Sequence, residues 1–173
     1  QVLCLFFSER VRYDDIDLYN IEAAPNSDHL LGTDELGRDV LTRLLYGGRV
    51  SLTVGLLASV FEIIIGVSVG AIAGFYGGKV DSLIMRITDV IMCFPFFVVA
   101  IALAAMIGPS MMNLIFIIAI LEWTKIARIV RAEVLSVKER DFIQAARSMG
   151  LSKMEIIIKH VLPNTFASIM VFA

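Results

Sequence analysis

Two acidic side chains stand alone in long apolar stretches of this sequence. Glu62 is the only charged residue between positions 50 and 78, and Asp89 is the only one between positions 87 and 121. A charge in such surroundings is by default a hypothesis for a functional site. Glu62 could bind an amino group or a cation in a pathway, or it could be a neutral or hydrogen-bonded structural acid between helices. Asp89 is expected to pair with Arg86 at i, i+3 rather than to touch a substrate.

The composition indicates a membrane protein. Of the 173 residues, 58% are hydrophobic and 18% are charged, against roughly 45–50% and about 25% in an ordinary soluble domain. The mean hydropathy of +0.81 argues against a soluble enzyme. Together with the long uncharged stretches, these values predict an all-α fold, a polytopic bundle of transmembrane helices.

The uncharged stretches define the predicted spans. A run of about 20 apolar residues crosses the hydrocarbon core at about 1.5 Å per residue. The sequence starts within one apolar run and ends within another, so we expect a bundle that is truncated at both ends. In chain order, the predicted spans are the end of one helix at 1–7, Ser51–Phe75, Ile87–Ile107, a third that starts at Met111 and uses Glu122 to Ala127 to reach the far side, and the start of another at Thr165–Ala173.

Small residues and one proline mark where the predicted spans pack or bend. Gly66, Gly70 and Gly74 recur every four residues, so they form a small-residue stripe that lets another helix approach closely. Glu62 lies one turn before that stripe on the same face. Pro95 predicts a fixed kink in the second span rather than a gate. The link from Tyr76 to Arg86 suits the cytoplasmic side.

Charge is segregated along the chain. Positions 8–49 hold nine acids and five bases, whereas positions 125–159 hold eight bases and four acids. The positive-inside rule therefore makes 8–49 an external segment and 128–160 a cytoplasmic loop of a membrane core that covers 51–173. The basic stretch lies between apolar spans and carries interleaved acids, which argues against a nucleic-acid partner. Within the external segment, Asp34 to Tyr46 is predicted to be an amphipathic helix that ends at Gly47-Gly48.

The basic loop is predicted to hold a helix, a glycine turn and a second helix. The first runs from Asp141, as its cap, to Met149, and Gly150 terminates it. The second starts at the capping box of Ser152 to Glu155 and reaches His160, ahead of Pro163. The first helix could pack on its own membrane domain or dock on a partner. Its expected docking face holds four residues at i, i+3, i+4 and i+7, namely Phe142, Ala145, Ala146 and Met149.

The same loop resembles a known signature. The string QAARSMGLSKMEIIIKHVLPN, Gln144 to Asn164, is similar to the cytoplasmic loop of the permeases of binding-protein-dependent ABC importers: Glu-Ala-Ala, three residues, Gly, nine residues, Ile-x-Leu-Pro. Gln144 replaces the Glu and His160 replaces the Ile. The matching residues are Ala145, Ala146, Gly150, Leu162 and Pro163. Four further stretches, His29–Arg49, Gly74–Asp81, Asp89–Pro95 and Trp123–Arg131, are similar to the second permease of oligopeptide, dipeptide and nickel importers.

The resemblance implies a mechanism and a set of partners. The chain would be one of two homologous permease subunits in the lipid bilayer of a bacterial inner membrane, with two cytoplasmic ATPases and an external substrate-binding protein. ATP and Mg would be bound by the ATPases, so no cofactor is expected in this chain. Phe142 and Met149 would insert into a groove on the ATPase, and Arg140 and Arg147 would pair with acids around it. The coupling residues implied are Phe142, Gln144, Ala145, Ala146, Arg147, Met149 and Gly150.

Several alternatives stay open at this level. Short peptides are the expected substrate, and nickel is the leading alternative within the same family. No catalytic residue is predicted, because the sequence contains no GxxxxGK[ST], HExxH or GxSxG motif. No metal site is predicted either, since Cys4 and Cys93 lie in apolar runs without ligand spacing. An intramembrane enzyme that pairs Glu62 with Asp89, and a passive channel or scaffold, are the rivals from other classes.

Overall fold

The computed structural model describes residues 13–165, which form helices and connecting segments. The chain divides into two compact units, Gln1–Gly55 and Leu56–Ala173, which are described separately below. Among the described residues the only β-type pairing is the isolated bridge between Thr33 and Asp39. The all-α prediction is confirmed. The helix end predicted at 1–7 and most of the apolar run after Thr165 lie outside the described residues.

The first unit begins with an irregular segment that local hydrogen bonds hold in place. The Asp34 carboxylate accepts hydrogen bonds from the backbone N–H groups of Leu36 and Arg38 at 2.9 and 3.0 Å. It also pairs with the side chains of Arg38 and Arg43. Gly37 has a φ of 72°, and a Cβ there would lie 1.8 Å from the carbonyl oxygen of Asp17. These constraints keep Asp34 to Arg38 out of a helix.

The first long helix, α2, spans Val40–Tyr76. It starts after Asp39 because the carboxylate of that residue accepts the backbone N–H of Thr42 at 2.7 Å, as an N-cap does. The prediction of a separate helix from Asp34 to Tyr46 is therefore wrong, and so is the predicted stop at Gly47-Gly48. Each glycine costs a helix only about 1 kcal/mol relative to alanine, and the long apolar sequence that follows outweighs that cost.

Helix α2 is the described helix that is long and apolar enough to cross a membrane by itself. Its 37 residues correspond to about 55 Å, more than the roughly 30 Å of a hydrocarbon core. The predicted span Ser51–Phe75 lies entirely within it.

In the second unit, α2 is followed almost at once by α3, Gly78–Met92, and then by α4, Phe96–Ile107. Gly77 alone separates α2 from α3, so the link predicted from Tyr76 to Arg86 is mostly helical. Helices α3 and α4 meet at an angle of 82°, as in a broken span or a re-entrant loop. The chain bends at Pro95 as predicted, but the bend is a break between two helices and not a kink within one helix.

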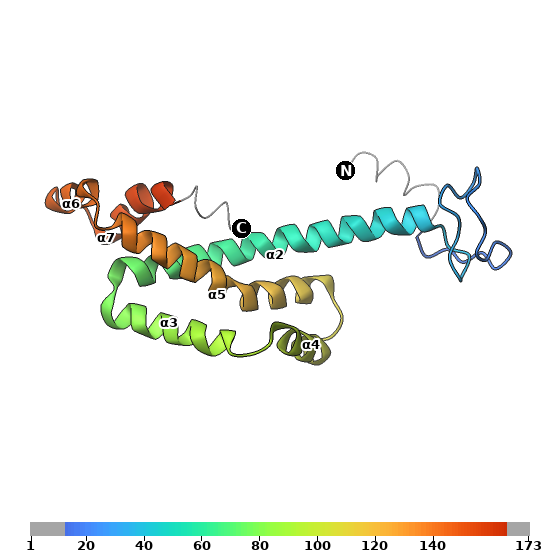
Figure 1. Ribbon diagram of the computed structural model, residues 1–173, viewed down its shortest axis with the longest axis horizontal. Coiled ribbons are helices and arrows are strands. Elements are labelled where there is room, and N and C mark those ends of the chain that lie inside the picture. Colours follow the sequence, from blue (N-terminus) through green and yellow to red (C-terminus); the bar gives the residue numbers. More distant parts are fainter. Residues whose placement is uncertain (1–12, 166–173) are drawn as a thin grey trace. The chain divides into compact units, whose positions relative to one another are not determined.

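The break has a local cause. Pro95 has no N–H to donate and disfavours helical backbone at the residue before it. It lies in extended conformation, with φ −61° and ψ 120°, as the N-cap of α4. Three residues, Cys93 to Pro95, therefore separate the two helices, and Figure 1 shows the resulting turn between them.

Helix α5, Met111–Val137, runs back along the second half of α2 (Figure 1). The turn at Gly108 to Ser110 connects it to α4, and Gly108 has a φ of 97°. The helix continues without interruption past the predicted boundary at Ala127. The first ten positions of the predicted loop 128–160 are thus helical and carry on the direction of the span.

Helix α5 lies directly against the glycine stripe of α2. A Cβ on Gly66 would lie 2.6 Å from the Cβ of Ile126, and one on Gly70 would lie 2.4 Å from the carbonyl oxygen of Ala127. A Cβ on Gly74 would lie 2.9 Å from the carbonyl oxygen of Arg131. Only glycine permits this approach of the two backbones.

The chain then forms α6, Asp141–Ser148, α7, Lys153–Ile156, and the π-helix η1, Ile157–Val161. Helical backbone continues to Thr165, so the prediction that the second loop helix ends at His160 is wrong. In a regular α-helix the ring of Pro163 would clash with the carbonyl four residues earlier. The wider π turn before it relieves that clash, and the Asn164 side chain donates to the His160 carbonyl at 2.7 Å.

Candidate functional site

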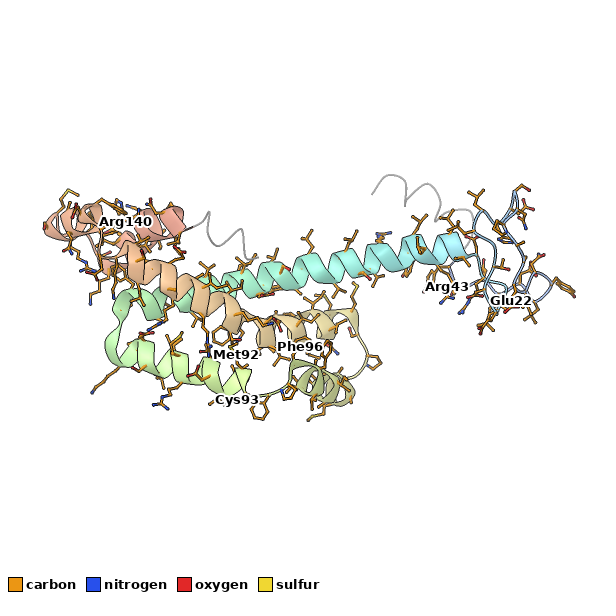
Figure 2. The ribbon with its side chains drawn as sticks, viewed as in Figure 1. Glu22, Arg43, Met92, Cys93, Phe96 and Arg140 are labelled. Carbon is orange, nitrogen blue, oxygen red and sulfur yellow. The ribbon has the colours of Figure 1, made fainter. Side chains whose placement is uncertain are left out.

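Helix α6 is a short helix with a defined end. The N–H of Gly150 donates to the Arg147 carbonyl at 3.0 Å, and the N–H of Leu151 donates to the Ala146 carbonyl at 3.3 Å. With a φ of 80° at Gly150, these two bonds form a Schellman motif. Gly150 ends the helix as predicted. Asp141 lies in the first turn rather than at the cap, which is Arg140 (labelled in Figure 2).

The two faces of α6 differ from the prediction. Ile143 is fully buried and Ala146 is 1% exposed, and both belong to the hydrophobic core of the second unit. Ala145 and Met149 are exposed, and Phe142 is exposed at the edge of the outer face. The prediction that Ala146 shares one outer face with Ala145 is therefore wrong.

Ile143 is the anchor that sequence reasoning missed. It precedes Ala146 by three residues, so the pair forms a second apolar stripe at helical spacing. The branched, fully apolar side chain of Ile143 is the sequence signal that the stripe of Ile143 and Ala146 faces inward. The stripe that begins with Phe142 faces outward. The core cluster that receives it includes Phe75 of α2, Val134 of α5 and Val161 of η1.

Two cation–aromatic contacts hold the loop against the end of α2. The Arg147 guanidinium lies 5.5 Å from the ring centroid of Phe75, and the Lys153 ammonium lies 5.2 Å from that of Tyr76. Such contacts stabilise by about 0.5–1 kcal/mol at exposed sites. Arg147 thus has a contact within its own chain, whereas the sequence predicted an acid on a partner.

The second loop helix is capped as predicted. Ser152 accepts the N–H of Glu155 at 3.3 Å, and the Glu155 carboxylate accepts the N–H of Ser152 at 3.1 Å. The bond from the Ser152 backbone lowers the pKa of Glu155. Its carboxylate therefore stays ionised at neutral pH and holds the start of α7.

The exposed outer face of α6, the coupling ridge, consists of Phe142, Ala145 and Met149. Met149 is 72% exposed and Phe142 is 36% exposed. The small side chain of Ala145 between them leaves room for a neighbour to approach. Gln144 and Arg147 flank the ridge and are also exposed. An exposed apolar ridge on a buried, capped base is suited to docking on another protein.

Ion pairs join α5 to α3. Arg131 donates to both carboxylate oxygens of Asp81, at 2.5 and 2.6 Å, and Arg128 pairs with Asp89. The expected pairing of Asp89 with Arg86 is therefore wrong, because packing of α3 on α5 presents a better partner than the helix itself. Lys138 adds a bond to the Gly74 carbonyl at 3.1 Å.

A second charge cluster joins α5 to the apolar part of α2. Glu122 and Lys125 of α5 form an ion pair at 2.5 Å. Both interact electrostatically with Glu62 of α2, which is partly buried. Sequence patterns single out Glu62 of this cluster but not Glu122 and Lys125, because these two follow an uncharged run and lie at the predicted end of the third span.

The cluster borders a cavity of about 230 Å³. Glu122, Lys125 and Thr124 supply its polar wall. Figure 2 labels Met92 and Phe96 on the two sides of the α3–α4 break, next to Cys93. Pro95 lies in this break, so it bends α4 away from the axis of α3 beside the cavity. The apolar wall consists of Ile91, Met92, Phe94, Phe96, Val99 and Leu121.

A metal centre finds no support in this arrangement. Within residues 13–165, no group of three or more His, Cys, Asp or Glu side chains is placed to hold a metal ion. His29 instead lies 3.2 Å from Asp39 in the first unit. Burial works to raise the pKa of Asp39, but hydrogen bonds from Thr42 and His29 outweigh it and the pKa is lowered.

Comparison with known proteins gives a consistent set of matches. Residues 66–173 match the family described as binding-protein-dependent transport system inner membrane component. The chain is 42% identical to the dipeptide transport system permease protein DppC of Alkalihalophilus pseudofirmus, over 93% of this chain and 53% of that protein. It is 36% identical to the oligopeptide transport system permease protein OppC of Bacillus subtilis, over 94% and 53%.

A further relative is the glutathione transport system permease protein GsiD of Pectobacterium atrosepticum. It is 41% identical over 92% of this chain and 52% of its own length. The chain therefore spans about half the length of the curated relatives that it matches.

Proposed function

Because this chain belongs to the family of binding-protein-dependent transport system inner membrane components, we propose that it is a permease subunit of an ATP-driven importer of short peptides. It is a membrane protein. We place it in the inner membrane of a bacterium with several crossings. Positions 8–49 are then external and positions 128–160 are on the cytoplasmic side.

The observation that carries this proposal is the coupling ridge on its rigid base. A partner ATPase would bind Phe142, Ala145 and Met149. Ile143 and Ala146 would transmit its movement to the core that they share with α2 and α5. Interfaces and packed cores switch between discrete arrangements, so movement of α6 would rock these helices between inward and outward states.

The partners follow from the same proposal. A homologous second permease completes the pathway, two ATPases supply ATP hydrolysis with their own Mg, and an external binding protein delivers substrate. The relatives are transport permeases, which indicates a subunit that is not an enzyme. In this proposal the chain binds no cofactor, and its role is to form half of the pathway.

Short peptides are the preferred substrate class. Relatives that cover most of this chain are named for dipeptides, oligopeptides and glutathione. The nickel alternative has less support. The alternative of an intramembrane enzyme that pairs Glu62 with Asp89 also has less support. Asp89 pairs with Arg128, and Glu62 interacts with Glu122 and Lys125.

The decisive experiment compares two neighbouring alanines in the complete transporter. Ala145→Glu places a charge on the coupling ridge. It should leave the permease in the membrane while weakening ATPase binding at least about tenfold, which is about 1.4 kcal/mol. Ala146→Glu buries the same charge in the core and should instead reduce the amount of folded permease. Co-purification of the ATPase and peptide-stimulated ATP hydrolysis are the measurements.

Ala145→Ser is the matched control, because it keeps a small side chain at the same position. It should retain both ATPase binding and stimulated hydrolysis. If Ala145→Glu behaves like Ala145→Ser in both assays, α6 is not the ATPase contact.

A further inference from the structure

We propose that the cavity between the α3–α4 break and α5 binds the α-ammonium group of a peptide in transit, with Glu122 of the cavity wall as the contacting carboxylate and Glu62, which does not line the cavity, as a more distant counter-charge. This inference rests on the proposed function and names a contact within the pathway. It starts from the cavity of about 230 Å³ that Glu122 and Lys125 line.

The depth of the cluster indicates that it faces water. Glu62 lies within the uncharged stretch of α2, and Glu122 and Lys125 of α5 lie close enough to interact with it electrostatically. Ionisable side chains at membrane depth face the bundle interior or a water-filled cavity. The Lys125 side chain is 58% exposed, and Lys125 and Glu122 both line the cavity.

The charge balance selects the ligand. Two carboxylates and one ammonium give the cluster a net charge of −1 when all three are ionised. Lys125 neutralises Glu122 through the 2.5 Å pair, and Glu62 then remains without an equal counter-charge. A cationic group that enters the cavity restores neutrality, whereas a carboxylate would add a third negative charge.

The apolar walls and the volume of the cavity limit the size of the peptide segment that can enter with the ammonium group. Pockets for drug-sized ligands hold about 300–1,000 Å³, so 230 Å³ fits one terminal residue rather than a whole oligopeptide. Met92, Phe96 and Leu121 offer that residue an apolar surface with no directional contacts. The site therefore recognises the amino end of a peptide and tolerates different first side chains.

The test uses the complete transporter, with its ATPases and binding protein, in proteoliposomes. Uptake is measured for a free tripeptide and for the same tripeptide acetylated at its amino end, and the affinity of the binding protein for each is measured separately. Glu122→Gln should raise the KM for the free tripeptide at least fivefold and leave the KM for the acetylated one unchanged. Lys125→Met removes the opposing charge, so its KM for the free tripeptide should not rise.

Two controls and a third peptide complete the design. Glu35→Gln and Lys79→Met make the same chemical changes on exposed residues outside the cavity and should leave both KM values unchanged. An acetylated tripeptide with a lysine side chain carries an ammonium at another position. If Glu122→Gln raises its KM as well, the assignment to the α-ammonium is overturned.

Failure of the inference is distinct from failure of the proposed function. If the wild-type complex takes up no peptide, the proposed function is wrong. If the wild type takes up peptide and Glu122→Gln changes both KM values equally or not at all, the function stands and the site is wrong.

A labelling experiment covers the case in which Glu122→Gln does not assemble. In a complete transporter from which Cys4, Cys93 and every other reactive cysteine have been removed, Lys125→Cys should react with a charged, water-soluble thiol reagent. The free tripeptide should slow that reaction at least twofold, whereas Lys79→Cys should react without protection. An unreactive Lys125→Cys, or one that the tripeptide does not protect, overturns the proposal.

Discussion

The contact between α2 and α5 allows one substitution to be worked through in detail. In Gly70→Ala, the new Cβ would lie 2.4 Å from the carbonyl oxygen of Ala127 and 2.9 Å from the Cβ of Val130. Neither atom is the end of a flexible side chain, so the helices must separate. Overpacking of this kind costs about 1–3 kcal/mol, and we expect the upper end because a backbone atom is involved.

The same substitution also has a favourable term. Alanine is better than glycine in a helix by about 0.8–1.0 kcal/mol, so the expected net loss for Gly70→Ala is about 2 kcal/mol. Gly55→Ala isolates the favourable term, because Gly55 lies in the same helix and has nothing within 4 Å of its added Cβ. The two variants should therefore differ in sign.

Thermal unfolding of the purified permease in detergent is the measurement. A loss of about 2 kcal/mol lowers the Tm of a chain of this size by about 4–8 °C, whereas Gly55→Ala should raise it by a few degrees at most. A Tm for Gly70→Ala equal to or above that of Gly55→Ala would refute the close packing of these two helices.

Three other predictions concern the loop, the ion pairs and the segment 13–39. Gly150→Ala should destabilise α6 by about 1–2 kcal/mol, because alanine resists the positive φ; faster amide exchange in 141–149 with unchanged exchange in α2 is the expected result. Asp81→Asn and Arg131→Met should be non-additive by about 1–3 kcal/mol in a double-mutant cycle, and additivity would remove the bidentate pair as a link between α3 and α5. The Arg38 side chain lowers the pKa of Asp34, so that carboxylate stabilises the segment 13–39 above the unfolded pKa of about 3.9 and less as the pH falls below it. Proteolysis within 13–39 should increase in acid, and Asp34→Asn should remove that part of the pH dependence.

Local signals in the sequence were sufficient for several elements. The uncharged run after Ser51, the glycine at position 150 and the Ser152 capping box each specify structure through the backbone of a few residues. Those predictions agree with α2, with the end of α6 and with the start of α7.

The errors concern features that depend on the rest of the fold. Gly47-Gly48 did not stop α2, because two weak residues yield to a long apolar helix. Pro95 produced a break of 82° rather than a kink, and no local rule fixes that angle. Ala146 and Asp89 face partners on other helices, which periodicity along one helix does not identify. The charge cluster at Glu122 was missed for the same reason.

The π-helix before Pro163 takes up one extra residue. Each α-helical residue advances by about 100° around the axis, and a π turn closes its hydrogen bond over one residue more than an α turn. Deleting one residue from Ile157–Val161 would restore α-type hydrogen bonds and leave Pro163 and Asn164 on nearly the same side of the helix, because the π turn already holds one residue more than an α turn. The shortened helix would then bring the ring of Pro163 against the carbonyl four residues earlier, so these five positions match the proline that follows them.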